Sequence, residues 1–272
     1  MLKKQAIKAN YVEALKSIYE KDEINALFKW ISEDVIHLPE LQQKELFDDY
    51  LTKLALKQPL QQVLGYTYFY NLKFKVNKHV LIPRPETEEL VYMMLQECGK
   101  TSNQEILDIG TGSGCIAISL KKNLPTAQVH AIDVSEEALK IAYTNAKENG
   151  VEVHFKKDNA LALKADDYPK FHIIVSNPPY IALSEKQNMH DNVVNFEPHL
   201  ALFVEDDAPL IFYDKIADFA LKNLYPNGLL FFEINQNLAV ETQELIQKKG
   251  FKAQIIKDLN NNNRFIKAQL LG

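Results

Sequence analysis

Apolar residues in the first 64 positions recur every three or four places, which is the spacing of one face of an α-helix. Three such stretches follow one another before the first glycine, Gly65. We predict a helical N-terminal domain over residues 1–64, with Asp22 and Ser32 as N-caps, and take it as a candidate docking region for a substrate. The apolar positions are Val12, Leu15, Ile18, Tyr19, Ile24, Leu27, Phe28, Ile31, Leu41, Leu46, Phe47, Tyr50, Leu51 and Leu54.

The pattern changes after Gly65, where aromatic and branched residues begin to alternate with polar ones. This alternation is typical of strands, and we predict a β-hairpin of two short strands around Asn77-Lys78. We assign residues 65–82 as a β-hairpin linker between two domains. Pro83 and Pro85 then precede Thr87, which is predicted to cap a helix or, as an alternative, to form one wall of a ligand pocket.

From Glu105 onward, short apolar runs alternate with amphipathic stretches, which is typical of a parallel sheet covered by helices on both faces. We therefore predict an α/β domain over residues 83–272. Strands are expected near residues 105–109, 128–132, 151–155, 171–176, 228–234, 252–257 and 264–270. Helices are expected near residues 115–123, 135–148, 209–224 and 237–249.

One predicted strand ends abruptly in Asn177, Pro178, Pro179 and Tyr180. The Asn side chain offers a carbonyl acceptor, and neither proline has a backbone N–H that would compete for nearby carbonyls. A rigid row of acceptors of this kind suits an incoming –NH2 group, and Tyr180 can lie flat against a planar amide or base. The alternative is a strand-to-loop turn that the prolines merely stiffen.

A second predicted strand runs into a glycine-rich turn and then a helix, with the spacing GxGxG. A ligand can approach such a backbone closely because glycine has no side chain. Asp108, just before the turn, is suited to a ligand ammonium or to bracing the turn. The candidate contact residues of the turn are Gly110, Thr111, Gly112, Ser113 and Gly114.

Two further acids follow the next two predicted strands. Asp133 lies about 20 residues beyond the turn, where a carboxylate can accept the hydroxyls of a ribose, and Asp158 could meet an adenine edge. A nucleoside that carries a zwitterionic amino acid fits these features better than NAD does, and S-adenosylmethionine is such a molecule. The alternative is that Asp133 only caps the helix that begins near Ser135.

Composition narrows the class of protein. The net charge of −5 gives no general attraction to a phosphate backbone, so nucleic acid is the weaker choice of partner. Two distant cysteines suggest a reducing compartment, and neither a signal peptide nor a membrane-spanning stretch is apparent. We therefore expect a cytoplasmic protein, and we expect it to be a monomer. No metal site is expected, because the histidines lack the spacing of metal ligands.

The motifs together resemble the protein-(glutamine-N5) methyltransferases of peptide-chain release factors, also called the HemK or PrmC family. The resemblance covers nearly the whole chain. The glycine turn and the NPPY motif alone indicate only amino-group methyltransferases, and the flanking motifs narrow the choice to this family. The matching segments are VLIPRPETEELV (80–91), DIGTGSGCIAISL (108–120), AIDVS (131–135), SNPPYI (176–181) and EPHLAL (197–202).

The resemblance implies a class I methyltransferase fold: a Rossmann-like, seven-stranded and mostly parallel sheet whose last strand is antiparallel. It implies transfer of a methyl group from S-adenosyl-L-methionine, leaving S-adenosyl-L-homocysteine, to the Gln of the Gly-Gly-Gln motif in class 1 release factors. By resemblance, Gly110–Gly114, Asp133 and Asn177 contact the cofactor, and Asn177–Tyr180 cradle the substrate amide. Asn159 stands where family members often have an aromatic that stacks on adenine, and Asn235 replaces the glycine of the usual EIG sequence.

Two other functions remain open on the sequence. An adenine or cytosine amino methyltransferase acting on DNA or RNA would also suit the NPPY motif, although the acidic balance and the lack of an obvious target-recognition insert count against it. A non-catalytic binding module with a methyltransferase fold is the second alternative. The stretch 182–208 is expected to be irregular, either a lid or a surface loop, and Glu197 within it is expected to brace the NPPY loop.

Overall fold

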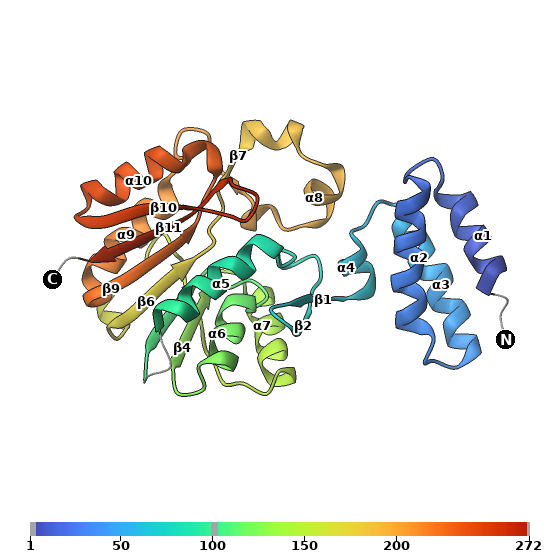
Figure 1. Cartoon of the computed structure of the whole chain (residues 1–272), viewed down its shortest axis with the longest axis horizontal. Coiled ribbons are helices and arrows are strands. Elements are labelled where there is room, and N and C mark those ends of the chain that lie inside the picture. The colour runs from blue at the N-terminus through green and yellow to red at the C-terminus, as the bar shows by residue number, and fades with distance from the viewer. Residues whose placement is uncertain (1–3, 99–102, 271–272) are drawn as a thin grey trace.

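The computed structural model describes residues 4–98 and 103–270, so the outermost residues of both predicted domains lie outside the described part (Figure 1). Four helices at the N-terminus pack around a core of their own that includes Tyr11, Phe28 and Phe47. Their amphipathic faces converge as the apolar spacing predicts, and the helices lie to one side of the sheet (Figure 1). The helices are α1 (Lys4–Leu15), α2 (Lys21–Val35), α3 (Glu40–Ala55) and α4 (Leu60–Leu64).

The two predicted N-caps in this region are wrong. Helix α2 runs without a break from Lys21 to Val35, so Asp22 lies in its first turn and Ser32 in its last. The continuous buried face from Ile24 to Val35 explains the difference, because interrupting the helix at Ser32 would remove this face from the core.

The hairpin exists, but its predicted turn at Asn77-Lys78 is wrong. Strands β1 (Tyr66–Phe69) and β2 (Leu72–Lys75) are joined by two residues, Tyr70 and Asn71, with φ of 49° and 60°. Positive φ at both central residues is the requirement of the tight turn that matches the twist of a hairpin. The register is anchored by Phe69 and Phe74, which are buried in the core of the large sheet.

The large sheet has seven strands in the order β10-β11-β9-β6-β3-β4-β5, and β11 alone runs in the opposite direction to the other strands. This confirms the predicted class I methyltransferase architecture. Strands β5 and β9 begin a few residues from their predicted starts. The strands are β3 (Glu105–Ile109), β4 (Gln128–Asp133), β5 (His154–Lys157), β6 (Phe171–Ser176), β9 (Leu224–Glu233), β10 (Phe251–Lys257) and β11 (Asn263–Leu270).

Helices cover both faces of the sheet (Figure 1). One apolar core joins the sheet to α5, α6 and α7, and a second joins it to α9 and α10. The helices are α5 (Pro85–Cys98), α6 (Cys115–Asn123), α7 (Glu136–Glu148), α9 (Ile211–Asn223) and α10 (Ala239–Lys248).

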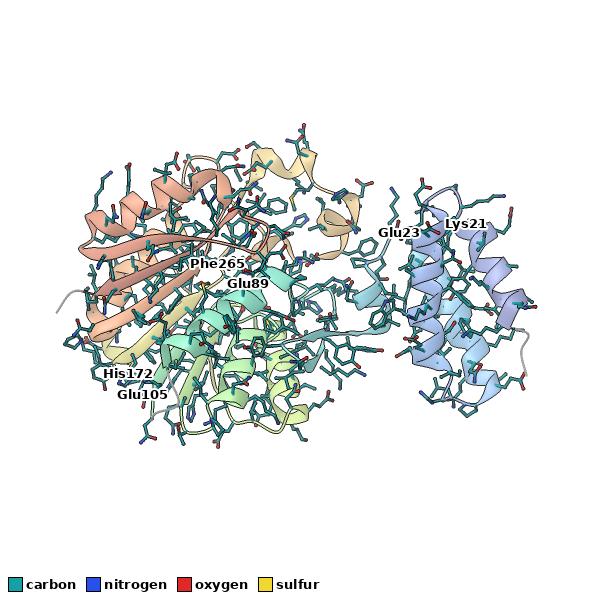
Figure 2. The ribbon with its side chains drawn as sticks, viewed as in Figure 1. Lys21, Glu23, Glu89, Glu105, His172 and Phe265 are labelled. Atoms are coloured by element: carbon teal, nitrogen blue, oxygen red, sulfur yellow. The ribbon has the colours of Figure 1, made fainter. Side chains whose placement is uncertain are left out.

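The strand order reverses between β3 and β6, because the chain continues from β3 to β4 and β5 on one side and returns to β6 on the other. Ligands of open α/β sheets bind at such a switch point, outside the carboxyl ends of the strands. The glycine turn follows β3 and Asn177 follows β6, so both lie at this position. At the opposite edge the Glu105 amide donates to His172 Nδ1 at 3.0 Å, and Figure 2 shows both residues there.

The stretch 182–208 is more regular than expected. It contains two short paired strands, β7 (Ile181–Ala182) and β8 (Phe203–Val204), and the helix α8 (Asp191–Phe196). Two 3-10 helices, η2 (Leu183–Asn188) and η3 (His199–Ala201), complete it. The Gln62 side chain in α4 donates to the Phe196 carbonyl at 2.9 Å, which ties this stretch to the helical N-terminus.

Candidate active site

A cavity of about 330 Å³ opens at the carboxyl ends of β3, β4 and β6. Most of the predicted site residues line it, which shows that separate sequence motifs meet at one place. Thr87 lines it as well, together with Pro83 and Arg84, so the expected pocket wall is present. The predicted residues that line the cavity are Gly110, Thr111, Gly112, Ser113, Asp133, Asp158, Asn159, Asn177, Pro178 and Pro179. Asp108, Gly114 and Tyr180 do not line it.

The first two glycines of the turn leave room beside the backbone. Gly110 and Gly112 have φ of 78° and 54°, and a Cβ added to either would meet no atom within 4 Å. Both residues line the cavity, so the space that a side chain would fill is available to a ligand. The turn is held in place by the Gly112 amide, which donates to Asp133 Oδ2 at 2.9 Å. This arrangement fits a cofactor whose polar end approaches the backbone.

Gly114 has a different role. A Cβ at this position would lie 2.7 Å from Ile118 Cδ1 and 3.2 Å from Ala142 Cβ, and the residue has φ of 82°. The missing side chain allows α7 to approach the start of α6 closely. Gly114 therefore shapes the turn through helix packing and does not line the cavity.

Substitution of Gly114 by alanine is expected to destabilise the fold by about 1–3 kcal/mol, because a non-glycine residue in the left-handed region is strained and its Cβ would clash with Ile118. Urea denaturation of the variant measures the loss. Gly150→Ala is the matched control, since Gly150 also has positive φ but nothing within 4 Å of its Cβ position. A loss no larger at Gly114 than at Gly150 would contradict the packing role.

Asp108 braces the glycine turn from beneath. Its carboxyl is fully buried, and Oδ2 accepts a hydrogen bond of 2.6 Å from the Thr111 hydroxyl. Its Oδ1 has no hydrogen-bond partner among the described side chains and backbone. Burial raises the pKa of Asp108 to about 7, because the buried charged form loses its hydration. Of the two roles considered for Asp108, the geometry favours bracing over direct contact with a ligand.

The raised pKa of Asp108 predicts a pH-dependent stability. The unfolded carboxyl ionises near 3.8, whereas the folded one keeps its proton to about pH 7, so the folded state binds more protons between these values. The free energy of unfolding therefore falls by about 1.4 kcal/mol for each pH unit as the pH rises from roughly 4 to 7. Urea denaturation across this range should show a steeper decline for the wild type than for Asp108→Asn. Parallel curves would exclude Asp108 as the source.

Asp133 links the glycine turn to the start of α7. Its Oδ1 accepts from the Ser135 amide at 2.8 Å, and its Oδ2 accepts from Gly112. The cap of α7 is Ser135 itself, whose hydroxyl accepts from the Ala138 amide at 3.2 Å, so capping does not account for Asp133. Each carboxylate oxygen has a second lone pair for another donor. Asp133 lines the cavity and retains the capacity to accept ligand hydroxyls.

Asp158 and Asn159 lie close together on another part of the cavity wall. Asp158 accepts from the Tyr168 hydroxyl at 2.5 Å and pairs with Lys156 at 3.0 Å. The Asn159 side chain accepts from the Leu161 amide at 2.9 Å, which turns the chain locally. Leu161 also lines the cavity and is 39% exposed, so an apolar surface stands next to the position where the family often has an aromatic.

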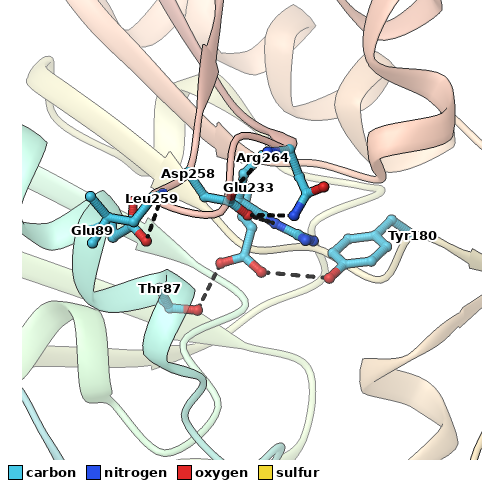
Figure 3. Close-up of polar contacts among 8 residues, drawn as sticks. Thr87, Glu89, Tyr180, Glu233, Asp258, Leu259 and Arg264 are labelled. Atoms are coloured by element: carbon cyan, nitrogen blue, oxygen red, sulfur yellow. Dashed lines mark hydrogen bonds and ion pairs between the residues drawn. The ribbon is translucent and has the colours of Figure 1, made fainter.

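The NPPY segment divides between two environments. Asn177, Pro178 and Pro179 line the cavity, as predicted for a row of acceptors. Tyr180 instead directs its hydroxyl to the buried Glu233, with 3.5 Å between the Tyr180 oxygen and Oε1 (Figure 3). Burial raises the pKa of Tyr180, so the phenol keeps its proton at neutral pH. The structure therefore does not place Tyr180 with the other three residues on the cavity wall.

The sequence did not single out Glu233 for the site, and it did not predict the contact between Glu233 and Thr87. Helix α5 already begins at Pro85, so the predicted capping role of Thr87 is wrong. The Thr87 hydroxyl donates to Glu233 Oε2 at 2.7 Å (Figure 3), and the Asn177 amide nitrogen lies 3.5 Å from the same hydroxyl. The available indication was a carboxylate that follows the apolar run Leu229–Phe232, in the strand that pairs with β6, after which Asn177 comes.

Glu197 is a brace, but not for the predicted partner. Its buried carboxylate accepts from Arg84 at 2.5 Å and from the Ile82 amide at 3.0 Å. The prediction that it supports the NPPY loop is therefore wrong: Glu197 holds the segment before α5, which also lines the cavity. The physical reason is that the Ile82 amide precedes Pro83 in an irregular segment and needs a buried acceptor.

Comparison with known proteins agrees with this architecture. The family model described as the methyltransferase small domain matches residues 87–197. A methyltransferase structure from Pyrococcus furiosus has a TM-score of 0.57 with 18% identity, covering 86% of this chain and all of that one, which supports the fold. The sheet order and the cavity at its switch point define a methyltransferase of class I.

Relatives of known name specify the family. The release factor glutamine methyltransferase of Flavobacterium psychrophilum is 48% identical over 276 residues, which cover 96% of each chain. That of Bacteroides thetaiotaomicron is 40% identical and covers 94% of this chain and 96% of its own length. The chain belongs to the family of release factor glutamine methyltransferases.

Residues 4–98 and 103–270 lack two classes of feature. No helix there is long and apolar enough to cross a membrane. The same residues contain no group of three or more His, Cys, Asp or Glu side chains that could hold a metal ion.

Proposed function

We propose that the protein transfers a methyl group from S-adenosyl-L-methionine to the side-chain amide nitrogen of the Gln in the Gly-Gly-Gln motif of class 1 peptide-chain release factors. The observation that carries the proposal is the shared cavity, in which the acceptor row of Asn177 and Pro178 lies with the glycine turn and Asp133. Identity of 48% over nearly the whole length of a release factor glutamine methyltransferase supports the choice of substrate.

The cavity fits the proposed cofactor. The open space beside Gly110 and Gly112 accommodates its amino-acid part, and Asp133 accepts the ribose hydroxyls. Leu161 and Val134, both exposed and on the cavity wall, provide apolar surface for the adenine beside Asp158. Asp108 acts on the ligand through the turn that it braces. When bound, S-adenosyl-L-methionine supplies an electrophilic methyl group and leaves as S-adenosyl-L-homocysteine.

The chain has to compensate for a poor nucleophile, because the lone pair of an amide nitrogen is delocalised into its carbonyl. We assign the Asn177 side-chain oxygen and the Pro178 carbonyl as acceptors of the two N–H bonds, which aims the nitrogen at the methyl group. Positioning of this kind can supply up to about 7–11 kcal/mol of the barrier. The same acceptors stabilise the positive charge that develops on nitrogen. Proton loss then follows methyl transfer.

The remaining parts of the chain are assigned by proposal. Residues 83–272 carry the methyltransferase site, residues 65–82 are the linker, and residues 1–64 dock the release factor. Exposed Trp30, Ile36 and Leu41 on the helical region are available for such a contact. The protein is proposed to act as a monomer in the cytoplasm, without a stable nucleic-acid or membrane partner.

Radiolabelled S-adenosyl-L-methionine distinguishes the proposal from its alternatives. Label transferred to a class 1 release factor, and not to DNA or RNA, is the expected outcome. Label on adenine or cytosine would favour the nucleic-acid methyltransferase. Failure to bind the cofactor in calorimetry would favour the non-catalytic module.

A further inference from the structure

We infer that Glu233 and Thr87 form a relay that fixes the orientation of the Asn177 side-chain amide, so that its oxygen faces the cavity. The inference rests on the proposed function, in which that oxygen accepts a hydrogen of the substrate amide. Glu233 and Thr87 are thus positioning residues, which act on the reaction through Asn177. The three residues come from different places in the chain: Glu233 ends β9, Thr87 lies in the first turn of α5, and Asn177 follows β6.

The direction of the hydrogen bonds follows from what each group can donate. An ionised carboxylate only accepts hydrogen bonds. The Thr87 hydroxyl therefore donates its single hydrogen to Glu233 Oε2, at 2.7 Å. The lone pairs of that hydroxyl are left for a donor. The group that meets them is the Asn177 amide nitrogen, at 3.5 Å.

A reversed Asn177 side chain would place its carbonyl oxygen against the Thr87 hydroxyl, which has no hydrogen left to donate. Its NH2 group would then face the substrate NH2 group, and two donors would oppose each other. The relay therefore selects one of the two amide orientations. Asn and Gln amides have nearly the same shape when flipped, so shape alone does not make this selection.

The surroundings hold the relay rigidly. Thr87 and Glu233 are 3% and 2% exposed, so water does not compete for their hydrogen bonds. Glu233 is flanked by the Tyr180 hydroxyl and by Arg264 on β11, and Arg264 in turn pairs with Asp258 at 3.2 Å (Figure 3). Burial raises the pKa of Glu233, while hydrogen bonds from the Thr87 hydroxyl and the Asn177 side chain and the charge of Arg264 favour its charged form. The carboxylate of a buried strand end is thereby kept next to the reacting amide.

The test compares Thr87→Val, which keeps the shape but removes the hydroxyl, with Thr87→Ser, which restores it. Using the full-length protein, a release factor and S-adenosyl-L-methionine, kcat of Thr87→Val should fall by about tenfold to a hundredfold, the cost of a misplacement near 1 Å. Cofactor affinity should stay within about threefold, because the change is made at Asn177 and not at the glycine turn. Thr87→Ser should recover most of the turnover.

Thr87→Val leaves the buried Glu233 carboxylate with one donor fewer, which can destabilise the fold. A second variant is therefore needed to separate a loss of stability from a loss of orientation. Thr87→Val combined with Glu233→Gln removes the buried charge and should show a similar loss of kcat, since the relay is broken in both. An unchanged kcat in both variants would overturn the inference. So would equal losses in Thr87→Val and Thr87→Ser, because the hydroxyl would then not be the determinant.

A readout without substrate separates this inference from the proposed function. In NMR spectra of 15N-labelled protein, the Asn177 side-chain NH2 signals are identified by their loss in Asn177→Ala. These signals should move in Thr87→Val and return in Thr87→Ser, whether or not the release factor is the substrate. Signals that stay in place in Thr87→Val would overturn the relay. Wild-type protein that fails to methylate a release factor would overturn the proposed function, and the NMR result would still decide the relay.

Discussion

Replacement of Asn177 by alanine is expected to abolish methyl transfer while the affinity for S-adenosyl-L-methionine stays within about tenfold, or about 1.4 kcal/mol. The change removes the side-chain oxygen proposed to accept one substrate N–H and leaves the glycine turn and Asp133 in place. Without that acceptor the amide nitrogen is neither aimed nor stabilised as charge develops on it. Single-turnover assays with labelled cofactor measure the transfer, and calorimetry measures the affinity.

Asn103→Ala is the matched control for this variant. Asn103 is exposed and precedes β3 at the edge of the sheet opposite the cavity, so its loss should leave both quantities unchanged. Turnover near the wild-type level in Asn177→Ala would remove Asn177 from the mechanism. A large loss of cofactor binding with normal folding would instead assign Asn177 to cofactor recognition.

Asp133→Ala is expected to act in the opposite way, weakening cofactor binding by about tenfold to a hundredfold, since hydrogen bonds to a charged group contribute about 1.5–3 kcal/mol. The variant loses the acceptor proposed for the ribose and also the contact that holds Gly112. Calorimetry with S-adenosyl-L-methionine gives the change directly.

Asp133→Asn separates these two effects. Asn keeps one acceptor oxygen, which can still hold the Gly112 amide, but it has no second carboxylate oxygen for the ribose. An affinity between those of the wild type and Asp133→Ala is expected. If calorimetry showed unchanged cofactor binding in Asp133→Ala, the ribose assignment would be wrong.

The site residues that could be predicted from the sequence are those in which a chemically suited side chain or turn stands at the end of a predicted strand. Asn177 and Gly110 each follow a parallel strand, and Asp133 ends one; the carboxyl ends of such strands share one edge of the sheet. Their meeting at the cavity could therefore be expected before the fold was known. The GxGxG spacing also indicated a turn that a ligand can approach.

Local sequence patterns could not predict the contacts between distant segments of the chain. Thr87 and Glu233 are 146 residues apart, and their hydrogen bond depends on the packing of α5 against β9. The hairpin turn fell at Tyr70-Asn71 because Phe69 and Phe74 fit the sheet core, which a local alternation of residues does not specify. Likewise, the GxGxG spacing does not show that its glycines have different roles. Gly110 and Gly112 leave space beside the backbone, whereas Gly114 allows the close approach of a neighbouring helix.

The buried Glu233 shows why such contacts matter for function. A carboxylate at the end of β9 would be costly without donors, and the Thr87 hydroxyl supplies one across the cavity wall. The contact joins the start of α5 to the end of β9, the strand that pairs with β6. The same contact that stabilises the buried charge therefore bears on the orientation of the acceptor, Asn177.

Mass spectrometry of a class 1 release factor, incubated with the protein and S-adenosyl-L-methionine, tests the central claim most directly. The account predicts a single added methyl group on the Gln side chain of the Gly-Gly-Gln motif, absent when Asn177→Ala replaces the wild type. A release factor that stays unmodified under these conditions, or that carries its methyl group on another residue, would contradict it.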